Sequence, residues 1–408
     1  MRCGRRPTWV ALCVLALTGC GHAVTGTAVP AAAPPDSVDL RALDTGTYPT
    51  TPAPTWGTAG TEDAGRRAEG QRLAGHVVGP WQVDPRFVDG SAGPAAIVTE
   101  PKHLGAVLWP TLAAPVHGHP FLVAFSADRH VTDPGDPTAL RNTVLLFATA
   151  EAATAVAEGM SQTAMDGRMS IEFYSPVPTE PVRAVPIPGH PDSTGAVLTH
   201  IVDGVEVREL TAITAHGRFV LVEVARSAEG PDRAAEFAGR ALDLQIPLLE
   251  DFTPTDPTHL AELSLDPAGL LARTLPLPTV GGGLANTTFD QRGAVHLEDH
   301  PIDVAEALAD AGVDAVVNAG DSVYRAGDPD RARRLADRLA DLVAAGGAAR
   351  PGPAVPGLPS GHCLSDTGGL VVRHRCFAAV DRYVIKSVAQ QLNSAQQQVA
   401  AQYRMLTG

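Results

Sequence analysis

The same order of predicted elements occurs twice along this chain of 408 residues. In the first half, a strand-like segment at 142–147 leads through a turn into an alanine-rich helix at 149–158. In the second half, a strand-like segment at 322–326 leads in the same way into a helix at 328–339. Each copy combines a strand, a helix-capping residue and an amphipathic helix. A chain built in this way is expected to form two similar modules.

The correspondence continues after these helices. Two short predicted strands follow in each half, and the second strand is similar in sequence, Gly-Arg-Phe-Val-Leu-Val at 217–222 and Asp-Arg-Tyr-Val-Ile-Lys at 381–386. Each half then closes with a predicted helix, at 232–242 and at 394–406. The alternative is a chance resemblance between two amphipathic patterns, but the shared order of these elements favours a duplication.

Hairpins of short strands with helices on one face indicate an α+β fold of two repeated modules, each a small antiparallel sheet packed with helices. We expect a first module at 38–251, with an N-terminal entry segment, and a second at 252–408, which ends in a helix. The first module also contains a predicted helix near 62–76, whose charged residues are interpreted as a solvated face. The predicted strand at 95–98 is matched loosely by 294–297.

The N-terminus has the pattern of an export signal. Arg2, Arg5 and Arg6 precede an apolar run at 9–17, a combination typical of a secretory signal peptide at 1–19. The apolar run is shorter than the roughly 20 residues that a membrane-spanning helix needs, so a permanent transmembrane anchor is not expected.

The predicted signal peptide leads into Leu-Thr-Gly-Cys, which resembles the lipobox of bacterial lipoproteins. The resemblance implies that Cys20 is acylated and attaches the protein to the membrane. The alternative is an ordinary signal peptide whose cysteine is incidental. Residues 20–37 are small, polar and proline-containing, which predicts that the lipidated cysteine begins a flexible tether. The expected location is the outer face of the cytoplasmic membrane, with the protein exported and lipid-anchored.

The chain has five cysteines, of which two leave with the signal peptide and a third is the lipidation site. Cys363 and Cys376 remain, and an even pair in an exported chain indicates a disulfide. Closing a loop of this length typically contributes about 3 kcal/mol to stability. The alternatives are a metal site completed by a histidine such as His362 or His374, or two free buried thiols.

His117 and His119 are candidates for a metal site. They alternate at what is interpreted as the start of a strand, so their rings could project from one face. A third zinc ligand would have to come from a residue such as His103 or His130. The alternative, a polar loop that enters the strand at 121–125, is the preferred interpretation.

No familiar catalytic motif occurs in the sequence. There is no Gly-x-Ser-x-Gly nucleophile segment, no His-Glu-x-x-His helix and no glycine-rich phosphate loop. The formal net charge of -14 argues against nucleic acid as a partner, because phosphate binding needs a basic surface. We therefore predict a protein that is not an enzyme and that needs no cofactor.

The lipobox, the tether and the twofold α+β repeat together resemble a family of actinobacterial envelope lipoproteins of unassigned function. More loosely, each module is similar to the extracellular sensor domain of mycobacterial serine/threonine kinases of the PknH type. That domain is cross-linked by cysteines, whereas here only the second module keeps a pair, at Cys363 and Cys376. The resemblance implies a fold and a location, and it supplies no catalytic residue.

The expected function is therefore a non-catalytic binding or interaction role at the membrane, with an envelope ligand or protein as the partner. The cleft between the modules is the predicted ligand site, because binding sites are common at domain interfaces. One alternative is an envelope hydrolase or metal-dependent enzyme without a recognisable motif. Another is a lipid carrier, which requires a deep apolar cavity between helix and sheet.

Overall fold

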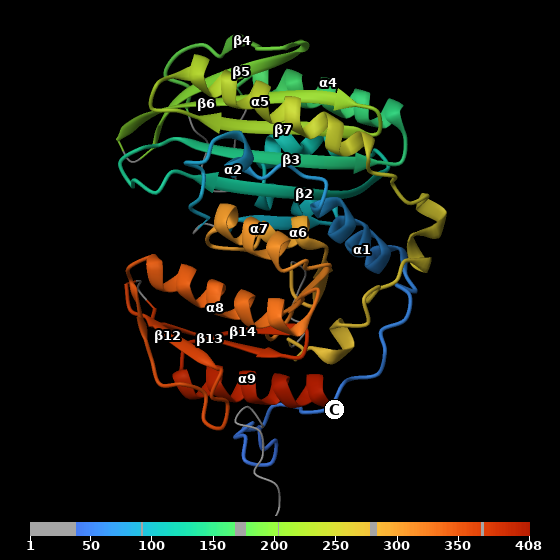
Figure 1. Ribbon diagram of the computed structural model, residues 1–408. Helices are drawn as coiled ribbons and strands as arrows, with labels where there is room; N and C mark the ends of the chain where they lie inside the picture. Colours follow the sequence, from blue (N-terminus) through green and yellow to red (C-terminus); the bar gives the residue numbers. More distant parts are fainter. Residues whose placement is uncertain (1–37, 91–92, 168–176, 203, 278–283, 369–370) are drawn as a thin grey trace, which may run out of the picture. The chain divides into compact units, whose positions relative to one another are not determined.

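The computed structural model describes residues 38–90, 93–167, 177–202, 204–277, 284–368 and 371–408 (Figure 1). These residues form a mixed α+β structure with two antiparallel sheets, which confirms the predicted fold class. The predicted signal peptide at 1–19, the lipidation site Cys20 and the tether at 20–37 lie outside the described residues. Among the helices that are described, none is long and apolar enough to cross a membrane.

The first sheet has the strand order β1-β2-β3-β7-β6-β5-β4, and each neighbouring pair is antiparallel. Its strands are β1 (Ala95–Val98), β2 (Phe121–His130), β3 (Ala139–Phe147), β4 (Arg183–Ile187), β5 (His190–Val202), β6 (Val205–His216) and β7 (Phe219–Arg226). The helices of this module are α1 (Glu62–Ala74), α2 (Pro80–Val83), η1 (Pro101–Ala106), α3 (Pro110–Ala113), η2 (Ala114–Val116), α4 (Ala150–Met165) and α5 (Pro231–Glu250).

The second sheet is also antiparallel throughout. Its strands are β8 (Thr287–Phe289), β9 (Ala315–Asn318), β10 (Ser322–Arg325), β11 (Ala349–Pro351), β12 (His362–Asp366), β13 (Arg373–Val380) and β14 (Tyr383–Ala389). The helices of this module are α6 (Gln291–Val295), α7 (Pro301–Asp310), α8 (Pro329–Ala345) and α9 (Leu392–Thr407). Two short helices, η3 (Pro257–Glu262) and η4 (Leu271–Arg273), lie in the linker between the modules.

The two sheets have the same topology. Read from β8, the second sheet has the order β8-β9-β10-β14-β13-β12-β11, which matches the first sheet strand for strand. The helices match as well, since α4 and α8 each follow the third strand, and α5 and α9 each follow the last strand. The predicted repeat is therefore confirmed as a repeated topology of two modules.

The equivalent helices α4 and α8 begin in the same way. Thr149 is the N-cap of α4, and its side chain accepts a hydrogen bond from the backbone N–H of Ala152 at 3.2 Å. Asp328 is the N-cap of α8 and accepts from the N–H of Arg331 at 2.8 Å. Each cap satisfies an N–H that the first helical turn leaves without a partner. The strand-to-helix turn that defines the repeat is thus encoded locally in both halves.

Helices cover both faces of each sheet, although the sequence predicts helices on one face. Val220 of β7 belongs to the apolar core that includes α4, whereas Phe219 and Leu221 belong to the core that includes α5. In the second module, Val384 shares a core with α8 and Ile385 shares a core with α9. Figure 1 shows α8 and α9 on opposite sides of the sheet. The last strand of each module is apolar on both sides because both faces are buried.

One apolar cluster includes side chains of both modules. It contains Leu140 and Leu242 from the first module and Leu308, Leu335 and Phe377 from the second. All five side chains are almost fully buried. The modules are therefore joined by a common core in addition to the linker.

The entry segment packs against the second module, although it precedes the first in sequence. Leu43 belongs to the core beneath α9. Asp44 accepts a hydrogen bond from the Gln397 side chain on α9 at 2.9 Å, and the N–H of Ala53 donates to the carbonyl of Ala272 at 2.8 Å. The first described residues therefore pack against the second module, although they precede the first module in sequence.

The first strand of the second module lies earlier than the sequence predicts. The predicted strand at 294–297 overlaps α6, and the strand equivalent to β1 is instead β8. The reason is local, because the Asp290 side chain accepts a hydrogen bond from the N–H of Gly293 at 2.7 Å and begins a helix there.

A glutamine in the last helix of each module binds an extended backbone segment through both ends of its amide. The Gln245 side chain accepts from the N–H of Val78 at 2.9 Å and donates to the carbonyl of His76 at 2.7 Å. Gln402 makes the same pair of bonds with the segment 273–275, both at 2.7 Å. These glutamines attach α5 and α9 to the segments that lead into their modules.

A buried carboxyl group lies at the same place beneath each last helix. In the first module, Glu223 of β7 pairs with Asn142 of β3 in the strand register. In the second module, the position equivalent to Asn142 is Asp321, one residue before β10, and the position equivalent to Glu223 is Ser387 on β14. The buried acid therefore lies on the other strand of the pair. Among the described residues, neither carboxyl group has a hydrogen-bond partner that meets the usual geometry. Burial raises the pKa of Asp321 to about 8 and raises that of Glu223 well above its ordinary value.

Replacing Glu223 with glutamine is expected to stabilise the protein increasingly as the pH rises above about 4.5. Above that pH the folded protein keeps a proton on Glu223 that the unfolded chain has lost, so the free energy of unfolding falls as pH rises. The slope is about 1.4 kcal/mol per pH unit until the raised pKa is reached. Chemical denaturation at a series of pH values measures the difference between wild type and Glu223→Gln. The exposed Glu158→Gln variant is the control and should show no pH-dependent gain; an equal gain in both variants would contradict this expectation.

Cys363 and Cys376 form a disulfide, as predicted. The two cysteines face each other in the register of β12 and β13, with their Cα atoms 4.1 Å apart. His362 and His374, considered as metal ligands, bond instead to an aspartate and a serine. The bond therefore links adjacent strands of the second module.

Candidate functional site

A cavity of about 600 Å³ lies where α1, the linker and the second sheet meet; we call it the junction cavity. Its walls come from α1, from the linker at 252–268 and from β8, β9 and β10. Most of its lining is apolar and comprises Ala68, Phe252, Leu263, Pro267, Ala268, Phe289, Ala315, Val316 and Val317. Pockets for small molecules typically measure about 300–1,000 Å³ and are mainly apolar. Both properties make the junction cavity the candidate site.

Glu69 fixes the linker to α1 along one wall of the cavity. The sequence places this residue on a solvated face, but its side chain is 0% exposed. One carboxylate oxygen accepts from the backbone N–H of Thr255 at 2.7 Å, and the other accepts from the Thr255 hydroxyl at 2.8 Å. Arg72 also donates to Glu69 and to the carbonyl of Thr253. Since both carboxylate oxygens have donors, Glu69 positions the wall of the cavity.

The linker also approaches α1 more closely than a side chain would allow. A Cβ atom on Gly65 would lie 2.2 Å from the carbonyl oxygen of Leu260, which belongs to η3. Only glycine therefore lets η3 pack against the helix at this point. This contact holds the beginning of the linker beside the cavity.

The other polar groups of the lining, on α1 and β10, also have partners within the protein. The Gln71 side chain accepts from the N–H of Thr288 at 3.0 Å and from its hydroxyl at 3.1 Å. Arg325 donates to Asp314 at 2.6 Å and to the carbonyl of Ala268 at 3.1 Å. The hydrogen bond to Asp314 raises the pKa of Arg325. These bonds connect α1 to β8 and β10 to the linker.

One corner of the cavity combines an imidazole, an aromatic ring and a cation. The rings of His76 and Phe252 lie 4.9 Å apart, and the Arg72 guanidinium lies 5.2 Å from the centre of the Phe252 ring. His76 Nδ1 lies 3.2 Å from the carbonyl oxygen of Arg72. The half-buried His76 thus brings a polar ring to the end of an otherwise apolar cavity.

Arg129 is the central polar contact between the two modules. It projects from β2 and is 1% exposed. Its guanidinium donates to the carbonyl of Val88 at 3.0 Å and to the carbonyls of His296 and Glu298, both at 2.9 Å. It also lies 5.5 Å from the centre of the Trp81 ring. Burial lowers the pKa of Arg129. The cation therefore fixes the loop after α6 against the first module.

His296 is a structural histidine next to this contact. Burial lowers its pKa to about 3, so the ring is neutral at physiological pH. Its Nε2 lies 3.1 Å from the carbonyl oxygen of Val77, which requires the proton to be on that nitrogen. The ring also contacts Trp81 and Phe125 edge to face. It fills the junction of the modules rather than facing a ligand.

A buried triad of Glu298, Tyr324 and Lys386 follows in the second module. The Tyr324 hydroxyl donates to one oxygen of Glu298 at 2.5 Å, and the Lys386 ammonium donates to the other at 2.6 Å. Burial alone would lower the pKa of Lys386, but the attraction to the Glu298 carboxylate outweighs it and raises the pKa. The hollow beside the triad measures about 20 Å³, which is room for a water molecule rather than a substrate.

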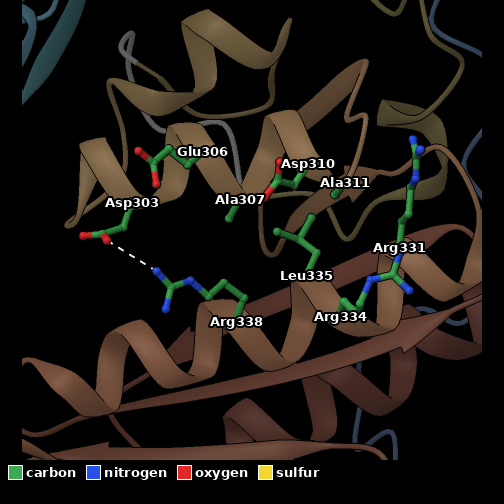
Figure 2. A pocket seen from close by; sticks show the side chains of 9 residues that line it. All are labelled: Asp303, Glu306, Ala307, Asp310, Ala311, Arg331, Arg334, Leu335 and Arg338. Atoms are coloured by element: carbon green, nitrogen blue, oxygen red, sulfur yellow. Dashed lines mark hydrogen bonds and ion pairs between the residues drawn. The ribbon is translucent and has the colours of Figure 1, made fainter.

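A smaller hollow of about 220 Å³ lies between α7 and α8 (Figure 2). Acidic side chains of α7 face arginines of α8 across it, with Ala307 and Leu335 between them. Asp303 and Arg338 approach to 3.4 Å, and both side chains are about half exposed. Exposed pairs of this kind contribute at most about 1 kcal/mol. The hollow is therefore a solvated seam between two helices.

The structure does not bring the predicted histidines together into a metal site. His117 and His119 lie on the loop between η2 and β2, not on a strand, because β2 begins only after Pro120. His130 is at the far end of β2 and lies 3.4 Å from Asp89. His103 lies on η1, close to a glutamate. Across the part of the chain that the structure describes, no group of three or more histidine, cysteine or acidic side chains could hold a metal.

Comparison with known proteins identifies a family and a similarity to solved structures. No similar protein is found among curated sequences. The extracellular domain of PknH from Mycobacterium tuberculosis is similar to 45% of this chain over 97% of its own length, with 12% identity and a TM-score of 0.32. The domain of unknown function DUF7373, N-terminal, matches residues 56–265, and DUF7373, C-terminal, matches residues 270–408. The chain therefore belongs to the DUF7373 family and contains both of its domains.

Proposed function

We propose that this protein is a non-catalytic lipoprotein of the cell envelope that binds an apolar or amphipathic ligand in the junction cavity. The main support for this proposal is the cavity, which measures about 600 Å³, is mainly apolar and lies between α1, the linker and the second sheet. A flexible hydrocarbon chain suits such a lining, since burial of apolar surface needs no directional partner. A small polar group at one end of the ligand would lie near His76.

The polar residues of the cavity favour binding over chemistry. Glu69, Arg72, Gln71 and Arg325 all bond to backbone or side chains that form the walls. A catalytic acid, base or nucleophile needs a free atom within reach of the substrate. The bonds made here hold the cavity together, so they support a receptor or carrier for a lipid-like molecule.

The proposed location rests on the N-terminal sequence and the disulfide. The charged start, the apolar run and the Leu-Thr-Gly-Cys segment support export and acylation at Cys20, which would anchor the protein to the outer face of the cytoplasmic membrane. The Cys363–Cys376 disulfide fits an oxidising compartment. An actinobacterial origin is part of this proposal. A protein held at a membrane would meet lipid-like ligands at high local concentration.

A fluorescent long-chain fatty acid provides the test for the cavity. It should bind the purified full-length protein saturably, and Ala268→Trp should weaken binding at least about tenfold by filling the cavity. Fluorescence titration measures both affinities. The matched control is Ala114→Trp, which adds the same ring at an exposed position of the first module. Equal binding by both variants, or no saturable binding by the wild type, would contradict the proposal.

A further inference from the structure

We propose that the groove beside β1 binds an extended peptide segment that carries a carboxylate, by adding it as a strand to the edge of the first sheet. This groove, which we call the edge groove, measures about 510 Å³. Its lining residues are Arg67, Ala96, Ile97, Val98, Thr99, Lys102, His103, Gly105 and Ala106. It is distinct from the junction cavity in its lining, so the two proposals can fail independently.

β1 is an edge strand, because its described pairing is with β2 alone. The carbonyl of Pro94 accepts a hydrogen bond from the N–H of Asp128 on β2. Because backbone groups alternate along an antiparallel pair, the N–H and C=O of Ala96 point toward β2, and those of Ala95 and Ile97 point away from it. Within the described residues, the outward N–H and C=O groups of Ala95 and Ile97 form no hydrogen bond. An edge of this kind is a template for a further strand.

The second module shows what the equivalent amide does when a partner is present. Leu221 of β7 and Ile385 of β14 occupy equivalent positions in the two modules. The strand pairing leads from Leu221 across the first sheet to Ile97 and from Ile385 across the second sheet to Thr288, so Ile97 and Thr288 are equivalent. The outward N–H of Thr288 donates to the Gln71 side chain at 3.0 Å. The first module has no counterpart of this bond among the described residues. The same edge is therefore occupied in one module and open in the other.

The charges around the edge groove select the ligand. Its two charged side chains are the cations Arg67 on α1 and Lys102 on η1, and His103 on η1 adds an imidazole. Arg67 has no ion pair within the described part of the chain, whereas Lys102 already lies 2.7 Å from Glu100. Lys102 is also one of only two lysines in a chain of net charge -14. A basic groove on an acidic protein favours a carboxylate, and Arg67 is the cation free to bind it.

The rest of the groove fits a main chain better than a bulky ligand. Gly105 and Ala106 at the end of η1 also line the groove, and neither has a long side chain. α1 closes the third side and approaches β1 tightly, since a Cβ on Gly70 would lie 2.6 Å from a methyl group of Ile97. Main-chain hydrogen bonds to β1 would supply affinity, and the carboxylate would supply orientation.

The experiment uses short β-branched peptides with a central glutamate and measures their binding to the full-length protein by fluorescence anisotropy. One peptide has the glutamate and a blocked C-terminus, and the other has no charged side chain and a free C-terminus, so the pair distinguishes a side-chain carboxylate from a terminal one. At least one of the two should bind at least about tenfold more tightly than an analogue that has lysine in place of glutamate and a blocked C-terminus. Hydrogen exchange should slow at 95–99 on binding, because the outward amides gain partners.

Two variants test the geometry. Arg67→Glu should weaken binding about tenfold or more, whereas Arg240→Glu, an exposed change of equal charge on α5, should not. Ala95→Pro removes an outward N–H without removing a bond to β2, so it should weaken binding while the melting temperature stays close to that of wild type. Equal binding of acidic and basic peptides, or protection outside 95–99, would overturn the proposal. Arg67→Glu and Ala95→Pro should both bind the fatty acid as tightly as wild type. A loss of peptide binding can then be distinguished from a failure of the junction cavity.

Discussion

Replacing Arg129 with methionine is expected to lower the free energy of unfolding by more than about 3 kcal/mol. The side chain is 1% exposed and donates to three backbone carbonyls, of Val88, His296 and Glu298. Methionine fills much of the space but leaves these acceptors without donors, and each buried unsatisfied group costs about 1–3 kcal/mol. Urea denaturation of the wild type and the variant measures the difference.

The control for this experiment is an arginine that makes only a surface contact. Arg208 bonds to Glu206, and both side chains are about half exposed. Arg208→Met should therefore change stability by less than about 0.5 kcal/mol. A loss at Arg129→Met no larger than at Arg208→Met would mean that the contact between the modules does not depend on this cation.

The second large effect is expected at Lys386. Lys386→Met leaves the Glu298 carboxylate buried without its cation, and breaking a buried ion pair in this way typically costs about 3–5 kcal/mol. The exposed fractions of the two side chains are 17% for Lys386 and 8% for Glu298, so water cannot replace the lost partner easily. Thermal and urea unfolding both report the loss.

A double variant separates the ion pair from simple packing. Glu298→Gln combined with Lys386→Met removes both charges and keeps an acceptor for the Tyr324 hydroxyl. We expect the double variant to recover more than about 1 kcal/mol relative to the sum of the single variants, since the two residues are in direct contact. Additive losses would contradict a coupled buried pair.

Much of the fold could be predicted from the sequence because its signals are local. The turns before α4 and α8 contain their capping residues, Thr149 and Asp328, within three residues of the groups that they bond. The disulfide could be predicted from the number of cysteines that remain after the signal peptide. The first strand of the second module could not be predicted, because Asp290 caps a helix where an apolar run suggests a strand.

The sites could not be predicted, because residues distant in sequence build them. Gln71 and Thr288 are 217 positions apart, and Arg129 reaches a carbonyl 167 positions away. Glu69 looks like a surface residue until the linker is seen to cover it. Lys386 could have been noticed, since a lysine inside an apolar strand requires a buried partner. His117 and His119 lie on a loop that leads into β2, which is the interpretation that the sequence favours.

The most direct test of ligand binding in the junction cavity is photo-crosslinking of the full-length protein with a diazirine-bearing fatty acid, followed by peptide mapping. We expect labels on α1, on the linker at 252–268 and on β8 and β9, and their loss in Ala268→Trp. Labelling that is spread over exposed apolar residues, or that persists unchanged in Ala268→Trp, would contradict a ligand site in the junction cavity.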